Sequence, residues 1–393
     1  MKNQNRKIPK IRFNRFDSVW EEAKIEDIVK ISAGGDVDKI KLKESGKYPV
    51  VANALTNKGI VGFYDDYKVK APAVTVTGRG DVGYAVARHE NFTPVVRLLT
   101  LQSENIDVDY LENQINSMRI LNESTGVPQL TAPQLGNYKV YHPEIEEQSA
   151  IGSLFRTLDD LLSSHKDNLA NYQSLKATML SKMFPKTGQT VPEIRLDGFE
   201  GEWENIRLGD CAIIKGRLGW KSLKQEEYTE VGPSMIAGKH IKNGVIDWGE
   251  VDHIPQWRYD ESPDIMLENG DIIFSKDGSL GNPALVSNLK GEATINSTMM
   301  LVRLNKKISS QFFYQVLTSS VFQKLIYLKV SGSSIPHLFQ ADMQDFKFYA
   351  PSIEEQRAIG SYFSNLDNLI NSHQEKIFQL ETLKKKLLKD MFI

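Results

Sequence analysis

The sequence predicts an α+β protein made of two related units, each a compact mixed α/β interior followed by one long helix. A segment of 42 residues occurs twice with 20 identical positions, and both copies place apolar residues at helical spacing over about 40 residues. Short β-branched and apolar runs between the copies are typical of strands. We expect the two helices to pair as an antiparallel coiled coil with approximate twofold symmetry.

The composition is that of an ordinary globular chain. Its 393 residues are 40% hydrophobic and 25% charged, which suggests two or three domains. No stretch approaches the roughly 20 apolar residues that span a bilayer, and the single cysteine, Cys211, rules out an internal disulfide and a cysteine-based zinc site. We therefore expect a cytoplasmic protein. The formal net charge of -2 means that any DNA binding must rely on local positive charge or on partners.

The repeat sets the domain boundaries. Residues 143–184 and 351–392 align without a gap, and the segment from Pro9 to Trp20 resembles that from Pro192 to Trp203. The helical copies are 208 residues apart and the openings 183 apart, so the second interior is longer by 25 residues. The expected parts are residues 1–143, the helix 144–184, a linker 185–192, residues 193–351 and the helix 352–393.

Each long helix carries an apolar stripe. One of the two heptad positions of this stripe recurs every seven residues along the whole helix. In the first copy, Leu154, Leu161 and Leu175 are expected at the other heptad position. The stepped residues are Ile151, Leu158, His165, Tyr172 and Met179, then Ile359, Leu366, His373, Leu380 and Leu387. His165 and His373 share a heptad position, where a polar layer fixing the helix register is a better interpretation than a metal site. Proline and two glutamates open each helix, which suits a helix entrance and its dipole.

Several segments of the interiors have strand or helix patterns. The expected helices are residues 109–122 and 309–328. The expected strands are residues 74–77, 84–87, 95–101, 272–274 and 299–304.

A glycine loop follows one expected strand in each interior. Residues 78–83 match the G-x-G-x-x-G pattern, but a strand rather than a helix follows, so nucleotide binding is disfavoured. Residues 275–281 share with them a basic residue, Arg79 or Lys276, near a Gly-x-(Val/Leu)-Gly turn. We interpret these turns as holding Arg79 and Lys276 toward a DNA groove or phosphate. A plain hairpin turn is the alternative.

Other loops are also candidates for nucleic-acid contact, and a solvated or structural turn is the alternative for each. Residues 215–224 hold four positive charges and one aromatic residue, which suits phosphate contact. Residues 124–130 and 331–338 precede the last strand of each interior. The candidates in these and neighbouring segments, beside Arg79 and Lys276, are Lys58, Gln129, Arg217, Trp220, Lys221, Lys239, Lys242, Ser334 and His337.

No catalytic pattern stands out. The sequence has no G-x-x-x-x-G-K-[ST] phosphate loop, no H-E-x-x-H and no G-x-S-x-G. Its one Asn-Pro, at Asn282, is followed by Ala-Leu, so the Asn/Asp-Pro-Pro-aromatic motif of amino-methyltransferases is missing. We expect neither an enzyme nor a metal site.

Taken together, these features resemble the specificity subunit of type I restriction–modification systems over about residues 16–392. The resemblance rests on two interiors, each followed by a helix opened by Pro-x-x-Glu-Glu-Gln-x-x-Ile, and on short motifs in order. These are residues 46–50, 77–80, 199–203, 208–210, 242–244, 269–272, 276–279 and 334–338. The first unit departs from the pattern, with Asn14 to Trp20 in place of Asp197 to Trp203 and Glu26-Asp27 in place of Gly209-Asp210.

The resemblance implies a non-catalytic subunit in which each interior reads one half of an asymmetric, split DNA site and the helices act as spacers. It also implies docking of two methyltransferase subunits and of ATP-driven restriction subunits. S-adenosylmethionine, ATP and magnesium would then bind the partners, and no cofactor this chain. The helix openings are the expected docking residues: Glu146, Glu147, Gln148, Glu354, Glu355 and Gln356.

Two further functions stay open from the sequence alone. The chain could serve a methyltransferase system that has no translocase, and nothing in its sequence separates the two cases. It could also be a coiled-coil scaffold protein without a DNA function. A scaffold would need no binding motifs in its interiors, yet glycine loops with a basic residue recur in both.

Overall fold

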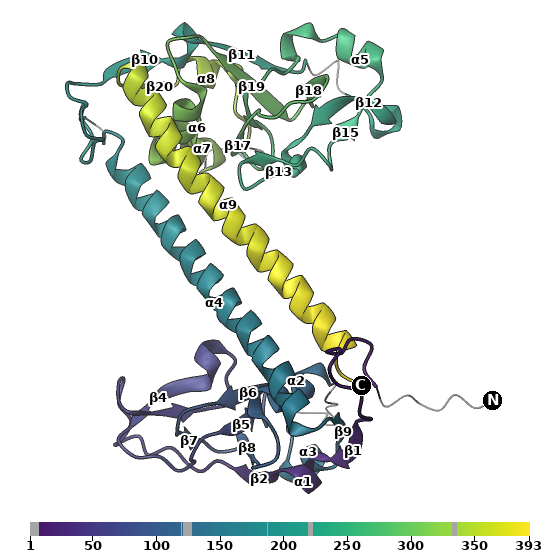
Figure 1. Cartoon of the computed structure of the whole chain (residues 1–393). Coiled ribbons are helices and arrows are strands. Elements are labelled where there is room, and N and C mark those ends of the chain that lie inside the picture. Colours follow the sequence, from purple (N-terminus) through teal and green to yellow (C-terminus); the bar gives the residue numbers. More distant parts are fainter. Residues whose placement is uncertain (1–7, 119, 121–127, 187, 219–222, 332–335) are drawn as a thin grey trace. The chain divides into compact units, whose positions relative to one another are not determined.

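The computed structural model describes residues 8–118, 120, 128–186, 188–218, 223–331 and 336–393 (Figure 1). The chain divides into unit 1, formed by residues up to 166 together with 375–393, and unit 2, formed by residues 167–374. The two predicted long helices are confirmed as α4 (Ile145–Lys182) and α9 (Ile353–Asp390), each of 38 residues and about 57 Å long. Each helix contributes one segment to each unit.

Unit 1 contains a four-stranded sheet, a smaller three-stranded sheet and a two-stranded ribbon. The four-stranded sheet has the order β2 (Lys30–Ala33), β8 (Leu99–Gln102), β5 (Ala73–Val76) and β6 (Ala85–Arg88). The other elements are β1 (Glu21–Lys24) paired with β9 (Lys139–His142), β4 (Ile60–Tyr64), β3 (Tyr48–Val51) and β7 (Thr93–Pro94) in the small sheet, α1 (Ile25–Ile28), η1 (Thr56–Gly59), α2 (Val108–Ser117) and α3 (Ala132–Gly136).

Unit 2 repeats this plan. Its four-stranded sheet has the order β11 (Ala212–Gly216), β19 (Met299–Leu304), β16 (Ile272–Ser275) and β17 (Gly281–Leu285). The other elements are β10 (Glu204–Arg207) paired with β20 (Lys347–Ala350), β15 (Asp252–His253), β12 (Thr229–Ile236) and β18 (Ala293–Ile295) in the small sheet, η2 (Leu208–Asp210), η4 (Gln225–Glu227), α6 (Ser310–Thr318), α7 (Ser320–Ser331) and α8 (Gln340–Gln344).

The longer interior of unit 2 has extra elements in two connections. Between β12 and β15 lie η5 (Gly238–His240) and the hairpin of β13 (Ile241–Lys242) and β14 (Val245–Ile246). Between β15 and β16 lie α5 (Gln256–Asp260) and η6 (Pro263–Ile265). The corresponding connections of unit 1 hold only η1 and a loop, so unit 2 departs from unit 1 at the small sheet while the four-stranded sheet is kept.

In each unit the four-stranded sheet packs against the helix that follows it. All four residues of the central strands β5 and β16 are buried. In unit 1, Val74 and Leu101 share a cluster with Leu111 and Ile115 of α2. In unit 2 the cluster contains Phe274, Val302, Phe312 and Phe313, the last two from α6. The apolar runs that predicted strands are therefore the faces buried under these helices.

Most interior elements follow the sequence predictions, with three differences. The expected helix 109–122 is shorter, because α2 ends at Ser117 and Met118 is extended. The expected strand 95–101 is interrupted, because β7 ends at Pro94 and β8 begins at Leu99, with Arg97 at a positive φ of 69° between them. The expected helix 309–328 is two helices, since α6 ends at Thr318 and α7 begins at Ser320. The extended Ser319 at the break has a ψ of 168° and its hydroxyl donates to the carbonyl of Val316.

The helix entrances are built by the same contacts in both units. Arg12 donates from Nε and Nη2 to the Glu147 carboxylate at 2.6 Å each, and Arg195 makes the same pair of bonds to Glu355 at 2.8 and 2.6 Å. Just before each arginine, an amide bonds to the end of a long helix: Ile11 N donates to the Asp390 carbonyl and Ile194 N to the Lys182 carbonyl, both at 2.9 Å.

The glutamine after each of these glutamates ties the long helix to the interior. Gln148 Oε1 accepts from the backbone N of Asp107, the N-cap of α2, at 3.0 Å. Gln356 Oε1 accepts from the backbone N of Ser309, the N-cap of α6, at 3.0 Å. The repeated Glu-Glu-Gln motif is therefore the joint between the long helix and its interior.

Within each unit the two helix segments run antiparallel. Asp159 pairs with Lys384 and Lys166 with Glu381 in unit 1, and Lys176 pairs with Asp367 in unit 2. The pairs Asp159–Lys384 and Asp367–Lys176 are equivalent under the 208-residue repeat. The same ion pair between the two helices is therefore repeated in each unit.

Only half of the predicted seam is correct. Ile151 and Leu158 are buried as expected, but Leu161 and Leu175 are 44% and 37% exposed. The other half of the α4 seam is formed by Phe155 and Leu162, one residue further along the helix, and this 4–3 spacing extends through Leu169 to Lys176. His373, one of the two histidines that were expected in the seam, packs against Tyr172 with their ring centroids 5.5 Å apart.

Candidate nucleic-acid interface

Both glycine loops connect the central strand of the large sheet to its edge strand. Gly80 and Gly83 have φ values of 78° and 85°, and Gly278 and Gly281 have values of 71° and 89°, which residues other than glycine rarely adopt. Antiparallel strands follow both loops, β6 in unit 1 and β17 in unit 2. The helix that a dinucleotide fingerprint requires is therefore absent after Gly83, and the loops are hairpin turns that present their side chains.

In each unit the loop before the last strand of the interior pairs with the glycine loop. Leu130 N donates to the Gly78 carbonyl at 2.9 Å, and Arg79 and Gln129 form a β-bridge. Leu338 N donates to the Lys276 carbonyl at 2.9 Å, and Asp277 and His337 form the equivalent bridge. Both loops contain residues that the sequence indicates as candidates, but their pairing is a long-range contact that no local pattern indicates.

This pairing corrects one part of the sequence analysis. The shared sequence pattern predicts that Arg79 and Lys276 are equivalent positions of the two units. The bridges instead make Arg79 equivalent to Asp277, and Gly78 equivalent to Lys276. The alignment from the sequence motif and the alignment from the bridges differ by one residue. The backbone hydrogen bonds of the loop pairs show that the second is correct. The two units therefore present different chemistry from the same loop: a guanidinium in unit 1 and a carboxylate in unit 2.

Two further segments of unit 1 converge on its loop pair. Asn53 accepts from Gly78 N at 2.8 Å and donates to the Val96 carbonyl at 3.1 Å, so it joins three segments. The buried Arg88 donates to Thr75 Oγ1 at 3.0 Å and to the Lys58 carbonyl at 2.6 Å. Burial lowers the pKa of Arg88 to about 10, which still leaves it charged at neutral pH. Arg88 thereby fixes the turn that carries the exposed Lys58.

Arg97 belongs to this site although the sequence analysis missed it. Its carbonyl packs so closely on Gly78 that a Cβ added there would lie 2.2 Å from it. Its side chain is exposed, like those of Lys58, Arg79 and Gln129. The run Pro94 to Thr100 looks like a single apolar strand, and the interruption of that strand is what turns Arg97 outward.

In unit 2 the loop pair contains an acid–imidazole contact. His337 Nδ1 is hydrogen-bonded to Asp277 Oδ1, and Lys276 Nζ lies 3.8 Å from the other carboxylate oxygen. The His337 ring also packs against Phe339, with ring centroids 4.3 Å apart. Asp277 and His337 are about one-third exposed and Lys276 is more buried. Their polar atoms are therefore already engaged with one another.

The other predicted cations of unit 2 are paired or buried. Lys239 is bound to Asp252 and Lys242 to Asp247, at 3.0 and 2.7 Å, and the bond to Asp247 raises the pKa of Lys242. Arg217 was expected to contact phosphate, but its side chain is fully buried and donates to the Ile295 carbonyl at 3.1 Å, so this expectation is corrected. Trp220, Lys221 and Ser334 lie outside the described residues.

The docking residues expected at the helix openings also need correction. Glu147, Gln148, Glu355 and Gln356 are each at most 2% exposed, because they hold the helix joint. Only Glu146 and Glu354 keep exposed side chains. Exposed apolar groups lie further along the helices: Leu161 and Leu383 in unit 1, and their repeat equivalents Leu369 and Leu175 in unit 2.

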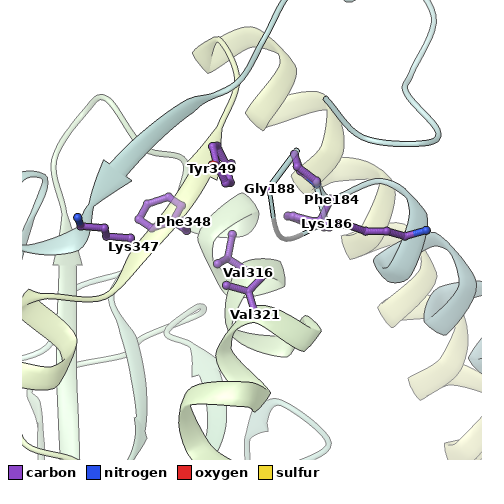
Figure 2. A pocket seen from close by; sticks show the side chains of 9 residues that line it. Phe184, Lys186, Gly188, Val316, Val321, Lys347, Phe348 and Tyr349 are labelled. Carbon is purple, nitrogen blue, oxygen red and sulfur yellow. The ribbon is translucent and has the colours of Figure 1, made fainter. Parts of the chain in front are cut away.

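A largely apolar cavity of about 210 Å³ lies in unit 2 (Figure 2). Phe184, Val316, Val321 and Phe348 line it, and its lining contains no carboxylate, histidine or cysteine. Lys186, Lys347 and Tyr349 also line it, and none of its lining residues belongs to the glycine loops. Across the described ranges, no group of three or more His, Cys, Asp or Glu residues is placed to hold a metal ion, and no helix is long and apolar enough to cross a membrane.

Known proteins share this organisation. Residues 17–172 and 200–382 match the family described as the type I restriction modification DNA specificity domain. A type I restriction enzyme specificity subunit of Methanocaldococcus jannaschii is 22% identical and aligns with 95% of this chain and 92% of that protein. A putative type I specificity subunit of Mycoplasma genitalium is 21% identical over 98% and 96%. The crystal structure of a type I system S subunit from M. genitalium has the same fold, with a TM-score of 0.73, 19% identity and coverage of 98% and 99%.

Proposed function

We infer the function from one premise: the chain belongs to the type I restriction–modification DNA specificity family, and it is the subunit that gives such a complex its DNA sequence specificity. The two matched regions contain the two interiors and their loop pairs. The role of each loop pair within this function is our proposal.

We propose that each interior reads one half of a split, asymmetric site through its loop pair. The supporting observation is that the same backbone bridge carries Arg79 and Gln129 in unit 1 but Asp277 and His337 in unit 2. Arginine and glutamine favour guanine and adenine edges in the major groove, whereas an aspartate accepts from cytosine. Different donors and acceptors on the same backbone frame predict different half-sites.

The helices α4 and α9 serve in this proposal as the spacer and as the docking element. Two methyltransferase subunits would dock, because each unit presents the same pair of exposed leucines, Leu161 with Leu383 and Leu369 with Leu175. Exposed leucines at repeated positions of two helices favour packing against a partner helix. Glu146 and Glu354 are exposed at the two openings and remain candidates for partner contact.

The chemistry belongs in this proposal to the partners. Methyltransferase subunits would bind S-adenosylmethionine, and restriction subunits would bind ATP and magnesium. This chain would select the site without breaking or forming a bond. Since both the substrate and the partners are intracellular, we propose the cytoplasm as its compartment.

Methylation mapping tests the proposal. A host expressing this chain with its methyltransferase partner is compared by long-read sequencing with a host that lacks the chain. We expect adenine methylation in a two-part motif that disappears without the chain. The Arg79→Ala variant should relax one half of the motif, and the His337→Ala variant the other half.

Each outcome has a definite meaning. Unchanged methylation without the chain, while both proteins are soluble and co-purify, would reject the specificity role. Relaxation of the same half-site by both variants would reject the assignment of one half to each loop pair. The Lys242→Ala variant is a matched control, because Lys242 is exposed but paired with Asp247 and should leave both halves unchanged.

A further inference from the structure

The two loop sites differ in whether their basic side chains are paired with carboxylates. Among the residues that the structure describes, no carboxylate lies within ion-pairing distance of Lys58, Arg79 or Arg97. The acid in the same loop, Asp81, is exposed, and it is the Asp81 backbone carbonyl that accepts a bond, from Thr77. In unit 2 the candidate cations Lys239, Lys242 and Lys276 all have a carboxylate within 4 Å.

The corresponding positions of unit 2 are not cationic. Asp277 stands at the position of Arg79, as the β-bridges show. Thr298 stands at the position of Arg97, because the Thr298 carbonyl accepts from Lys276 N at 2.8 Å where the Arg97 carbonyl contacts Gly78. Among the described residues at these loop positions, unpaired positive charge is therefore found in unit 1 and not in unit 2.

The backbone gives a second, independent indication. Lys58 and Arg97 have φ values of 49° and 69°, in the left-handed region that glycine and asparagine adopt at lower free energy. Long basic side chains thus occupy two positions where the fold would favour glycine. Strained positions of this kind concentrate at binding sites, where the side chain is needed for another reason.

Unpaired and paired cations differ in what they gain from a phosphate. An unpaired cation that binds a phosphate releases a counterion from the DNA, whereas a paired lysine must first give up its carboxylate. We propose that Lys58 and Arg97 form a phosphate-binding cluster in unit 1, beside the base-reading Arg79, that supplies most of the salt-dependent affinity of this chain for duplex DNA. This inference rests on the proposed function, and it assigns unit 2 a recognition role with little electrostatic contribution.

Salt titration of the full chain tests the cluster. Binding of a fluorescein-labelled 30-bp duplex of arbitrary sequence is measured by anisotropy between about 50 and 300 mM KCl, and the slope of log affinity against log salt is determined. Removing two phosphate contacts with the Lys58→Ala/Arg97→Ala double variant should reduce the slope by about 1.8. The Lys239→Ala/Lys242→Ala double variant removes the same charge from unit 2 and should leave the slope nearly unchanged.

The Arg97→Gly variant separates DNA contact from a structural role. Glycine relieves the left-handed strain, so the melting temperature should stay constant or rise. The slope should still fall by about 0.9. A variant that melts earlier would assign Arg97 a structural role and overturn its place in the cluster.

The outcomes distinguish this inference from the proposed function. If the wild-type chain binds no duplex even at the lowest salt, the cluster is rejected, whereas the specificity role is decided by methylation mapping in the presence of the partner. If it binds but both double variants lower the slope equally, net charge alone governs binding and the cluster is rejected. If it binds and the Lys58/Arg97 variant keeps the full slope, the cluster is also rejected.

Discussion

The helix joints keep the same residues in both units, whereas the loop pairs do not. At the joints the same residues make the same bonds: Arg12 with Glu147 in unit 1 and Arg195 with Glu355 in unit 2. At the loops the backbone bridge is kept but its residues change, from Arg79 and Gln129 to Asp277 and His337. Contacts that fix geometry are repeated residue by residue, whereas positions that face outward from that geometry are free to differ.

In the proposed function, this difference would allow one duplicated fold to read two sequences. The glycine positions and the hydrogen bond from Leu130 or Leu338 hold each loop pair in one shape. Side chains on that shape can change without altering the strand register beneath them. The comparison predicts equal effects when equivalent joint residues are changed in the two units, and unequal effects when equivalent interior positions are changed.

The largest effects are expected at the buried ion pairs. Arg12→Ala leaves Glu147, whose side chain is 1% exposed, without its partner, and Arg195→Ala does the same to Glu355 at 2%. Breaking such a pair from one side costs about 3–5 kcal/mol. Urea unfolding should show this loss in both variants, and hydrogen exchange should locate it in unit 1 for the first and unit 2 for the second.

Two controls define this prediction. Arg207→Ala breaks an exposed pair with Asp345 and should cost far less stability than Arg12→Ala. The Arg12→Leu/Glu147→Leu double variant removes both charges and should recover much of the stability lost by Arg12→Ala. A large loss in one unit and none in the other would contradict the equivalence of the joints.

A smaller effect is expected at the glycines where the long helices touch the interiors. An added Cβ at Gly152 would lie 2.9 Å from the backbone N of Tyr110, and one at Gly360 would lie 3.0 Å from that of Phe312. Alanine normally stabilises a helix interior by about 1 kcal/mol relative to glycine. Here the clash should dominate, so thermal unfolding of Gly152→Ala and Gly360→Ala should show losses of about 1–3 kcal/mol.

The adjacent exposed serines serve as controls for the glycines. Ser153→Ala and Ser361→Ala change the same helices on their solvent side and should be neutral or slightly stabilising. If the glycine variants are as stable as these controls, the helices and interiors are not in close contact at these points.

The sequence predicted the repeat, the long helices and most strands because these depend on local periodicity. It placed Leu161 and Leu175 in the seam because their spacing from Leu154 fits a heptad as well as that of Phe155 and Leu162 does. Only burial distinguishes the two stripes: Phe155 is fully buried and Leu161 is 44% exposed. The choice depends on the partner segment, which periodicity alone does not contain.

The candidate site was only partly predictable for a related reason. Arg97 lies within an apolar run and Arg217 beside glycines, so the first looked like strand and the second like an open loop. Both expectations are wrong in the structure. Arg97 is exposed at a turn, and Arg217 is buried in contact with Glu261 and Ile295. The joint was more accessible to inference, since Arg12 and Glu147 each recur at equivalent positions of the second unit, and paired recurrence of opposite charges indicates a contact.

The smallest expected effect concerns an interior position at which the units differ. Glu112 on α2 and Tyr314 on α6 occupy equivalent positions, each next to one aspartate of the equivalent pairs, Asp159 or Asp367. Burial, together with the charge of Asp159, raises the pKa of Glu112 to about 7, while Lys384 opposes the shift. Burial raises the pKa of Tyr314 well above its ordinary range, so Tyr314 stays neutral between pH 5 and 8.

The sign of the pH effect follows from Glu112 alone. Below pH 4.5 the carboxyl is protonated in both the folded and unfolded chain and contributes nothing to pH dependence. Between pH 4.5 and 7 the folded chain holds a proton that the unfolded chain releases, so stability falls as pH rises. Glu112→Gln should therefore gain about 1–2 kcal/mol over wild type between pH 5 and 8, measured by urea unfolding, after allowance for its partial exposure. Tyr314→Phe should change stability by the same amount at both pH values. A pH-independent difference between Glu112→Gln and wild type would mean that the carboxyl is solvated, and that the two units do not differ electrostatically at this position.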